Sequence, residues 1–237
     1  MANRIIYIIM LLGLLTATSS MAQDQESGNW DTEKIKGTRH FPYPSYSGNP
    51  YLTDKFISGE IDFADGEKIE KLFLRYSTYR DEVIYFNRAI SAQIVIDKLS
   101  ISGFTLFGDD GTKRVFRQQY FNGFNSGNRF FEVLSDREIT LLAYRSVVLQ
   151  YCPVYNNEIG IVKNMEYVPS FNYYLYTNKD GYIPIKIGKN PFLSKFTKPN
   201  QKLVRKLLRQ NKITIKDEPG MVKALELVEA NRIAINF

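Results

Sequence analysis

The residues best suited to binding chemistry are the cations near the C-terminus. Ten Lys or Arg side chains lie between Lys186 and Lys216, with no Asp or Glu among them. Clustered cations attract phosphate, sulfate and carboxylate groups, and each is worth about 1 kcal/mol beside an anionic membrane surface. An ordinary charged helix face, whose apolar side packs on the β domain, is the favoured interpretation, and an anionic-surface contact is the functional alternative. Its expected residues are Lys198, Lys202, Arg205, Lys206, Arg209 and Lys212.

Carboxylates are the second group that could do chemistry, because two carboxyl groups suffice to hydrolyse a glycosidic bond. Their density here is typical of solvated strand faces and turns. The Gly-x-Ser-x-Gly, His-Glu-x-x-His and phosphate-loop motifs do not occur in the sequence. A carboxylate-based hydrolase therefore stays the alternative to a binding role. The acidic residues it could use are Glu60, Asp62, Asp65, Glu67, Asp81, Glu82 and Glu132.

The chain has one histidine, His40, and one cysteine, Cys152. His40 lies in a polar N-terminal stretch with no evident partner for base or zinc chemistry nearby. A single cysteine excludes an intramolecular disulfide. Because Cys152 follows an apolar run, we expect a buried, inert thiol. We read Asp109-Asp110 as a hairpin turn rather than a calcium loop, and we assign no catalytic, cofactor or metal residue and expect no cofactor.

Aromatic residues are abundant, with 16 Phe and 16 Tyr. Rings on an exposed strand face can bind sugars or peptides through flat apolar contact, whereas most rings in a β domain fill its core or rim. Both interpretations stay open for the candidate rings. These are Tyr43, Tyr46, Tyr79, Tyr173, Tyr174 and Tyr176.

The N-terminus predicts export. Arg4 precedes an apolar run from Ile5 to Leu15, about 11 residues, which is too short for a helix to cross a bilayer of roughly 30 Å. Ser20-Met21-Ala22 then supplies the small-x-small pattern of a cleavage site. We predict a signal peptide at residues 1–22 and a periplasmic, outer-membrane-associated or extracellular protein.

Three Asp-Gly turns between apolar runs predict a mainly β fold. They end at Gly66, Gly111 and Gly181. We expect antiparallel sheets, as a sandwich or an open barrel, over residues 51–190, preceded by an extended leader at 23–50. A bulge or an offset in the pairing is expected near Lys71. Residues 152–170, which carry two prolines, are expected to be irregular.

The C-terminal segment, residues 191–237, predicts two short helices packed on the β domain. The first would begin with Asn200 as its N-cap and end near Gln210, with Leu203, Val204, Leu207 and Leu208 on its apolar side. The second would begin at Asp217, with Pro219 in its first turn. Its expected buried face is Met221, Ala224, Leu225 and Val228.

Several short motifs occur in a fixed order along the chain. They are Asn49-Pro50-Tyr51-Leu52, Leu74-Arg75-Tyr76-Ser77-Thr78-Tyr79-Arg80-Asp81-Glu82, Phe130-Phe131-Glu132-Val133-Leu134, Tyr173-Tyr174-Leu175 and a Lys-rich helical end at 192–230. This arrangement resembles a group of uncharacterised secreted β-rich proteins common in Bacteroidota. The resemblance implies export and a β-rich fold, and it carries no catalytic residue.

These observations together predict an exported, non-catalytic, envelope-associated binding or accessory protein. The expected partners are an envelope protein, an anionic lipid or a glycan. An exported protein is not expected to meet nucleic acid. Without a second long apolar run, we expect peripheral rather than integral membrane contact.

Overall fold

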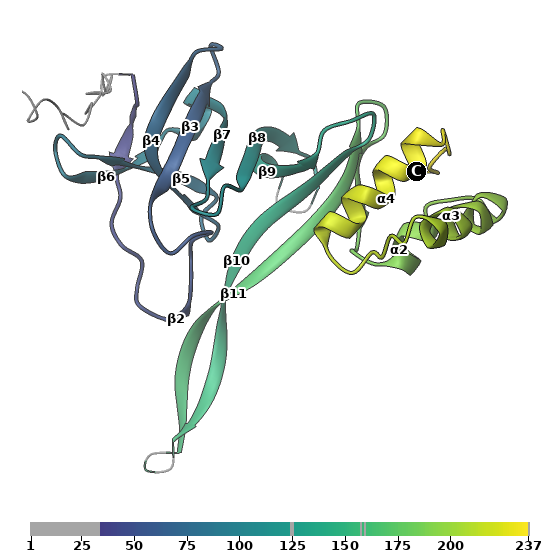
Figure 1. Ribbon diagram of the computed structural model, residues 1–237. Coiled ribbons are helices and arrows are strands. Elements are labelled where there is room, and N and C mark those ends of the chain that lie inside the picture. The colour runs from purple at the N-terminus through teal and green to yellow at the C-terminus, as the bar shows by residue number, and fades with distance from the viewer. Residues whose placement is uncertain (1–33, 124–125, 157, 159, 237) are drawn as a thin grey trace, which may run out of the picture. The chain divides into compact units, whose positions relative to one another are not determined.

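Figure 1 shows the computed structural model of the chain, which describes residues 34–236 apart from 124–125, 157 and 159. The predicted signal peptide and the first part of the predicted leader lie outside the described residues. The chain from residue 33 onward forms one compact unit.

All the described strands belong to one open sheet. The strands are β1 Gly37–Arg39, β2 Ser47–Gly48, β3 Ile57–Phe63, β4 Lys68–Ser77, β5 Glu82–Asn87, β6 Ala92–Ile96, β7 Ile101–Phe107, β8 Lys113–Phe121, β9 Gly127–Ser135, β10 Thr140–Asn156, β11 Gly160–Thr177 and β12 Gly181–Ile185. Their order is β1-β6-β5-β4-β3-β7-β8-β9-β10-β11-β12, and β2 pairs with β11. Apart from the parallel β2–β11 pair, the pairing is antiparallel. The predicted mainly β, antiparallel fold is confirmed.

The predicted hairpin turns are confirmed, because each Asp-Gly turn joins two paired strands. Gly66 has φ +89°, a conformation that suits glycine. The predicted bulge is also present. The β3–β4 register shifts between Gly59 and Ile61, and Lys71 on the facing strand has φ +56°. The extra residue explains why the apolar positions of β4 change phase along the strand.

The prediction of an irregular segment at 152–170 is wrong. Strands β10 and β11 pair continuously from Thr140 opposite Tyr176 to Asn156 opposite Gly160. Figure 1 shows them continuing as a two-stranded ribbon beyond the neighbouring strands. Both prolines therefore lie inside long strands, at positions where proline is normally disfavoured.

The register explains how the ribbon accepts its prolines. Pro169 opposes Val147, whose amide donates to the Thr78 carbonyl at 3.1 Å instead of to β11. This is a non-hydrogen-bonded pair, in which the amides point away from the partner strand. On the same strand as Val147, Pro153 lies an even number of residues further along and opposes Lys163. Because the two pairing types alternate along an antiparallel pair, Pro153 also lies in a non-hydrogen-bonded pair. Neither missing N–H therefore removes a β10–β11 hydrogen bond.

Three helices follow the sheet: α2 Lys189–Leu193, α3 Lys198–Gln210 and α4 Glu218–Ala230. Helix α2 is an addition to the two that were predicted. Asp217 caps α4 as predicted, accepting a hydrogen bond from the Gly220 amide at 2.8 Å. The predicted cap at Asn200 is wrong, since α3 starts after Thr197 with Pro199 in its first turn. Proline fits there because the first turn needs no intrahelical amide donor.

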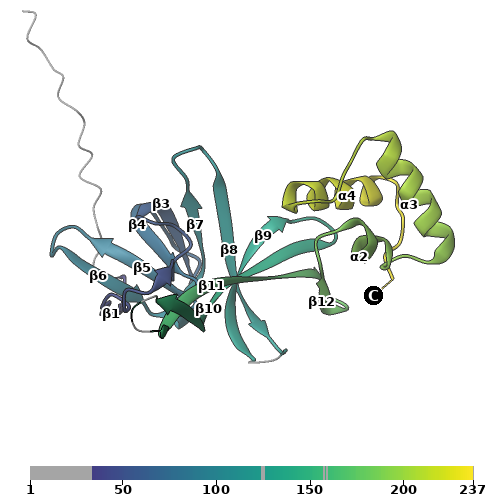
Figure 2. The ribbon, with the colours of Figure 1, turned by 90° about the horizontal axis from the view of Figure 1, so that it is seen from below.

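The helices pack against the last strands of the sheet. Leu141, Leu175 and Ile185 share one apolar cluster with the buried residues of all three helices. The predicted inner face of α4 is confirmed, because Met221, Ala224, Leu225 and Val228 are buried there. Figure 2 shows α2, α3 and α4 grouped beside β9 and β12. This cluster anchors the basic helix α3 to the sheet.

Candidate functional site

Helix α3 separates an apolar side from a cationic side. Val204 and Leu208 are buried, whereas Leu207 is half-buried. Leu203 was predicted to belong to the apolar side, but it is 45% exposed. Successive residues of a helix are rotated by about 100° around its axis. On that basis, the five cations of α3 fall within an arc of about 100°, so they form one stripe along its outer side.

A hollow of about 660 Å³ lies between this stripe and the ends of the neighbouring segments. Leu208, Ile213 and Thr214 form the rest of its wall. We call it the basic hollow, after the six cations that line it. They are Lys189, Lys202, Arg205, Lys206, Arg209 and Lys212.

The cations of the basic hollow are exposed, and none has an acidic partner among the described residues. No ion pair joins any of them to a carboxylate within residues 34–236 as described. Arg205 and Arg209, like Lys202 and Lys206, are spaced i, i+4, a spacing at which like charges repel and weaken a helix. An anion in the hollow would relieve this repulsion, and arginine can bind it through two parallel hydrogen bonds.

Five of the six predicted contact residues therefore meet around one hollow. Lys198 does not line it, since it is at the far end of α3, although its side chain is exposed. Lys189 lines the hollow but was missed, because α2 was not predicted. Lys189 lies in the run from Lys186 that contains no acid, and this signal in the sequence could have identified it.

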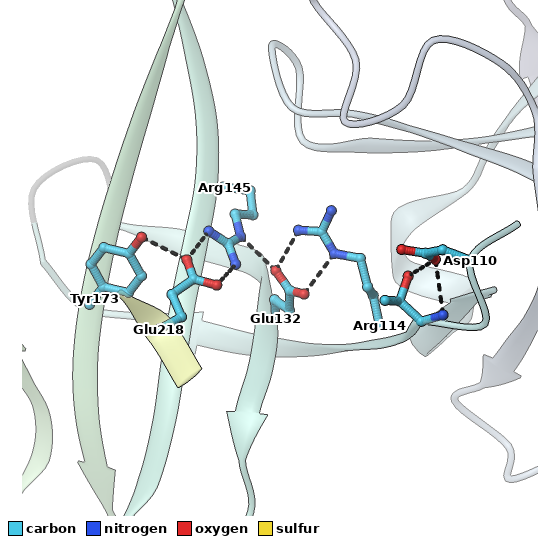
Figure 3. Close-up of polar contacts among 7 residues, drawn as sticks. Asp110, Arg114, Glu132, Arg145, Tyr173 and Glu218 are labelled. Carbon is cyan, nitrogen blue, oxygen red and sulfur yellow. Dashed lines mark hydrogen bonds and ion pairs between the residues drawn. The ribbon is translucent and has the colours of Figure 1, made fainter. Parts of the chain in front are cut away.

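A chain of charges centred on the buried Arg145 and Glu132 fixes α4, and with it the helical segment, to the sheet (Figure 3). Arg145 donates to both carboxylate oxygens of Glu218 at 2.5 and 2.8 Å, and Tyr173 donates its hydroxyl to the same carboxylate at 2.7 Å. Burial alone would raise the pKa of Glu218, but these donors outweigh it and lower the pKa. The first turn of α4 is thus held against β10 and β11.

The chain of charges continues through Glu132 on β9. Its carboxylate accepts two hydrogen bonds from Arg114, both at 2.7 Å, and one from Arg145 at 2.5 Å. Burial would lower the pKa of Arg145, but its two carboxylate partners, Glu218 and Glu132, outweigh this effect and raise the pKa. Alternating charges that satisfy one another in this way serve structure, because each carboxylate oxygen already has a donor.

Asp81 is a second buried carboxylate. One of its oxygens accepts from the Tyr76 hydroxyl at 2.6 Å and the Phe130 amide at 3.3 Å, and the other accepts from Lys98 at 2.5 Å. Burial raises the pKa of Asp81 although these donors oppose the rise. The prediction that the candidate acids lie on solvated faces is thus wrong for Asp81 and Glu132.

The acids of the β3–β4 hairpin have surface partners. Lys68 pairs with Glu60 and Asp62, and Lys34 pairs with Asp65 and Glu67. The other predicted acid, Glu82, accepts a hydrogen bond from the Tyr43 hydroxyl at 3.3 Å. None of these acids shares a hollow with the two buried carboxylates among the described cavities. Asp110 accepts from the Thr112 amide and hydroxyl, as expected of a hairpin turn.

The candidate rings occupy different places. Tyr43, Tyr46 and Tyr79 pack around the leader with His40, Tyr51 and Tyr167. Tyr174 and Tyr176 belong to a ring cluster of β8, β9, β11 and β12, and Tyr173 binds Glu218. His40 lies within hydrogen-bonding distance of the Tyr51 hydroxyl at 3.0 Å, and its pKa is lowered by burial and by Arg75.

Cys152 differs from its prediction. Its thiol is partly exposed on the ribbon and donates to Glu166 at 3.1 Å. That hydrogen bond raises its pKa, which keeps it a thiol. The predicted burial is wrong because the segment forms a two-stranded ribbon instead of a core strand.

No three His, Cys, Asp or Glu side chains gather in residues 34–236, as described, so that they could hold a metal ion. In the same part of the chain, no helix has the length and hydropathy needed to cross a membrane. Beyond the chain itself, a scan of protein-family models, a search of curated proteins and a search of solved structures found no match.

Proposed function

We propose that this chain is a non-catalytic accessory protein of the cell envelope that binds the phosphate-bearing headgroups of anionic lipids through the basic hollow. One observation carries the proposal: six exposed cations meet around one hollow, and none forms an ion pair with an acid in the described part of the chain. The predicted signal peptide and the resemblance to secreted proteins support an envelope location.

The charge supplies enough energy for such binding. Each cation near an anionic surface contributes about 1 kcal/mol, so six give at most about 6 kcal/mol. This is enough for reversible attachment, and it falls as salt screens the charges. The half-exposed Leu203 beside the stripe would add apolar contact with the interface.

The carboxylate hydrolase is the weaker proposal. A general acid needs an oxygen that can approach the leaving group. Both oxygens of Glu132 accept from guanidinium groups, and both oxygens of Asp81 accept from internal donors. The two buried carboxylates are thus engaged in holding strands and helix together, which favours the binding role.

Vesicle sedimentation of the purified mature protein tests the proposal. We expect binding to vesicles that contain phosphatidylglycerol, little binding to pure phosphatidylcholine, and release by high salt. A variant with Lys202, Arg205, Lys206 and Arg209 all changed to Glu should lose the binding, because the hollow then repels phosphate.

A charge-matched control separates the hollow from net charge. Lys36, Arg39, Lys179 and Lys223 are also exposed, and changing all four to Glu alters the charge equally. We expect this variant to keep most of its vesicle binding. Equal loss in both variants would show that overall charge, not the basic hollow, governs attachment.

A further inference from the structure

The sheet has a second hollow, on the face that the helices do not cover. On β11 and β12, Leu175 and Ile185 point into the apolar cluster beneath the helices. Their neighbours Tyr174 and Pro184 line a hollow of about 680 Å³ on the opposite side, as the alternation of a strand requires. An open sheet face is normally polar, so apolar rings gathered there call for an explanation.

Rings from five strands line this site, which we call the aromatic hollow. They are Phe121, Phe131, Tyr144, Tyr174 and Tyr182. The ring centroid of Phe121 lies 5.4 Å from that of Tyr174 and 5.3 Å from that of Tyr182. Phe131 is buried and stacks on Tyr182 at 5.3 Å, so it supports the outer rings from below. Mutual packing therefore holds the half-buried rings in fixed orientations.

Neutral polar groups complete the lining. The exposed amide of Asn172 and the hydroxyls of Tyr144 and Tyr174 form no hydrogen bond with other described residues. Burial raises the pKa of Tyr144 to about 12, so its hydroxyl stays a neutral donor and acceptor. The cation in the wall, Arg129, already faces Asp81 at 3.9 Å. Among the described residues, no carboxylate lines the aromatic hollow.

We infer that the aromatic hollow binds a neutral oligosaccharide, with a sugar ring stacked on Tyr174 and its hydroxyl groups bonded to Asn172 and Tyr144. A pyranose has an apolar C–H face and an edge of hydroxyls, which is the combination that rings beside amides and phenols complement. The volume is that of an ordinary ligand pocket. An extended peptide would instead pair with a strand edge, whereas this hollow is lined by side chains.

Titration calorimetry and saturation-transfer NMR on the purified mature protein test this inference. The probes are cellotetraose, chitotetraose, mannotetraose and maltotetraose. We expect at least one to bind saturably, with magnetisation transferred to the C–H protons of its rings. Failure of all four probes to bind would overturn the inference.

Variants assign the binding to the hollow. Tyr174→Ala should weaken it about tenfold, the worth of one ring stack. Asn172→Ala should weaken it several-fold, and because that side chain is exposed and makes no internal hydrogen bond, this variant tests the site even if Tyr174→Ala fails to fold. Tyr120→Ala is the matched control, since Tyr120 is 65% exposed on β8 and lies outside the hollow. Binding that survives both hollow variants would overturn the inference.

The inference is independent of the proposed lipid binding. The four-fold charge reversal on α3 should leave the sugar affinity unchanged, and Tyr174→Ala should leave vesicle binding unchanged. Loss of sugar binding in the α3 variant would place the sugar at the basic hollow and would contradict the aromatic site.

Discussion

Arg145 on β10 donates two parallel hydrogen bonds, of 2.5 and 2.8 Å, to the carboxylate of Glu218, the first residue of α4. The same guanidinium donates to Glu132 on β9 at 2.5 Å. Only 3% of Arg145 is exposed. A single buried side chain therefore joins two strands to the helical segment that carries the basic hollow.

Removing Arg145 should be costly. Arg145→Met leaves Glu132 buried with one cationic partner fewer and Glu218 with none, and breaking such pairs costs about 3–5 kcal/mol. The loss would be measured as a lower free energy of unfolding in urea. Arg137→Ala is the control, since its pair with Glu226 is exposed and should cost less than about 1 kcal/mol. Similar losses in both variants would contradict the structural role of Arg145.

The Arg145–Glu218 pair should also make stability depend on pH. The pKa of Glu218 is lower in the folded protein, so its contribution is complete above the unfolded value of about 4.3 and is lost as pH falls through the folded value. We expect the urea midpoint to decline from about pH 4.3 downward. In Glu218→Gln this part of the decline should be absent. An unchanged acid profile in the variant would refute the assignment.

Asp81 should be the other costly position. Asp81→Ala leaves Tyr76, Lys98 and the Phe130 amide without their acceptor, and each unsatisfied buried donor costs about 1–3 kcal/mol. We expect at least about 3 kcal/mol of destabilisation in urea unfolding. Asp97→Ala removes only an exposed cap of a short 3-10 turn and should cost about 1 kcal/mol. Comparable costs for the two would show that Asp81 is not an anchor.

Gly220 in the first turn of α4 should resist substitution. Alanine normally favours a helix over glycine by about 1 kcal/mol. Here, an added Cβ would lie 2.1 Å from the Thr214 carbonyl oxygen, so the helix or the preceding segment would have to shift. Gly220→Ala should lower stability by about 1–3 kcal/mol in thermal unfolding. Lys223→Ala, at an exposed position of the same helix, should change it little.

Repulsion among the cations of the basic hollow should lower the stability of α3. Lys206→Glu removes a like-charge pair with Lys202 and places an acid three residues before Arg209, so α3 should gain a few tenths of a kcal/mol. The same change should weaken vesicle binding. Lys223→Glu is the comparison, because it adds an acid near Glu226 and should gain nothing. A less stable Lys206→Glu protein would contradict the view that the cations repel one another.

Local patterns were enough for the fold class and for the start of α4. Asp-Gly turns act over a few residues, so they predict hairpins without knowledge of the rest of the chain. Asp217 followed by Pro219 is likewise a complete local start signal. The prediction of a cationic site was equally local, since a run without acids is visible in the sequence itself.

The tertiary structure decided the features that depend on pairing. Proline predicts a break in a strand. Whether Pro153 and Pro169 cause one depends on whether their missing N–H would face the partner strand or point away from it. Only the β10–β11 register decides this. Arg145, Glu132 and Glu218 come from three separate elements. Their mutual hydrogen bonds, and the meeting of five rings on the open sheet face, follow from strand order, which no local pattern contains.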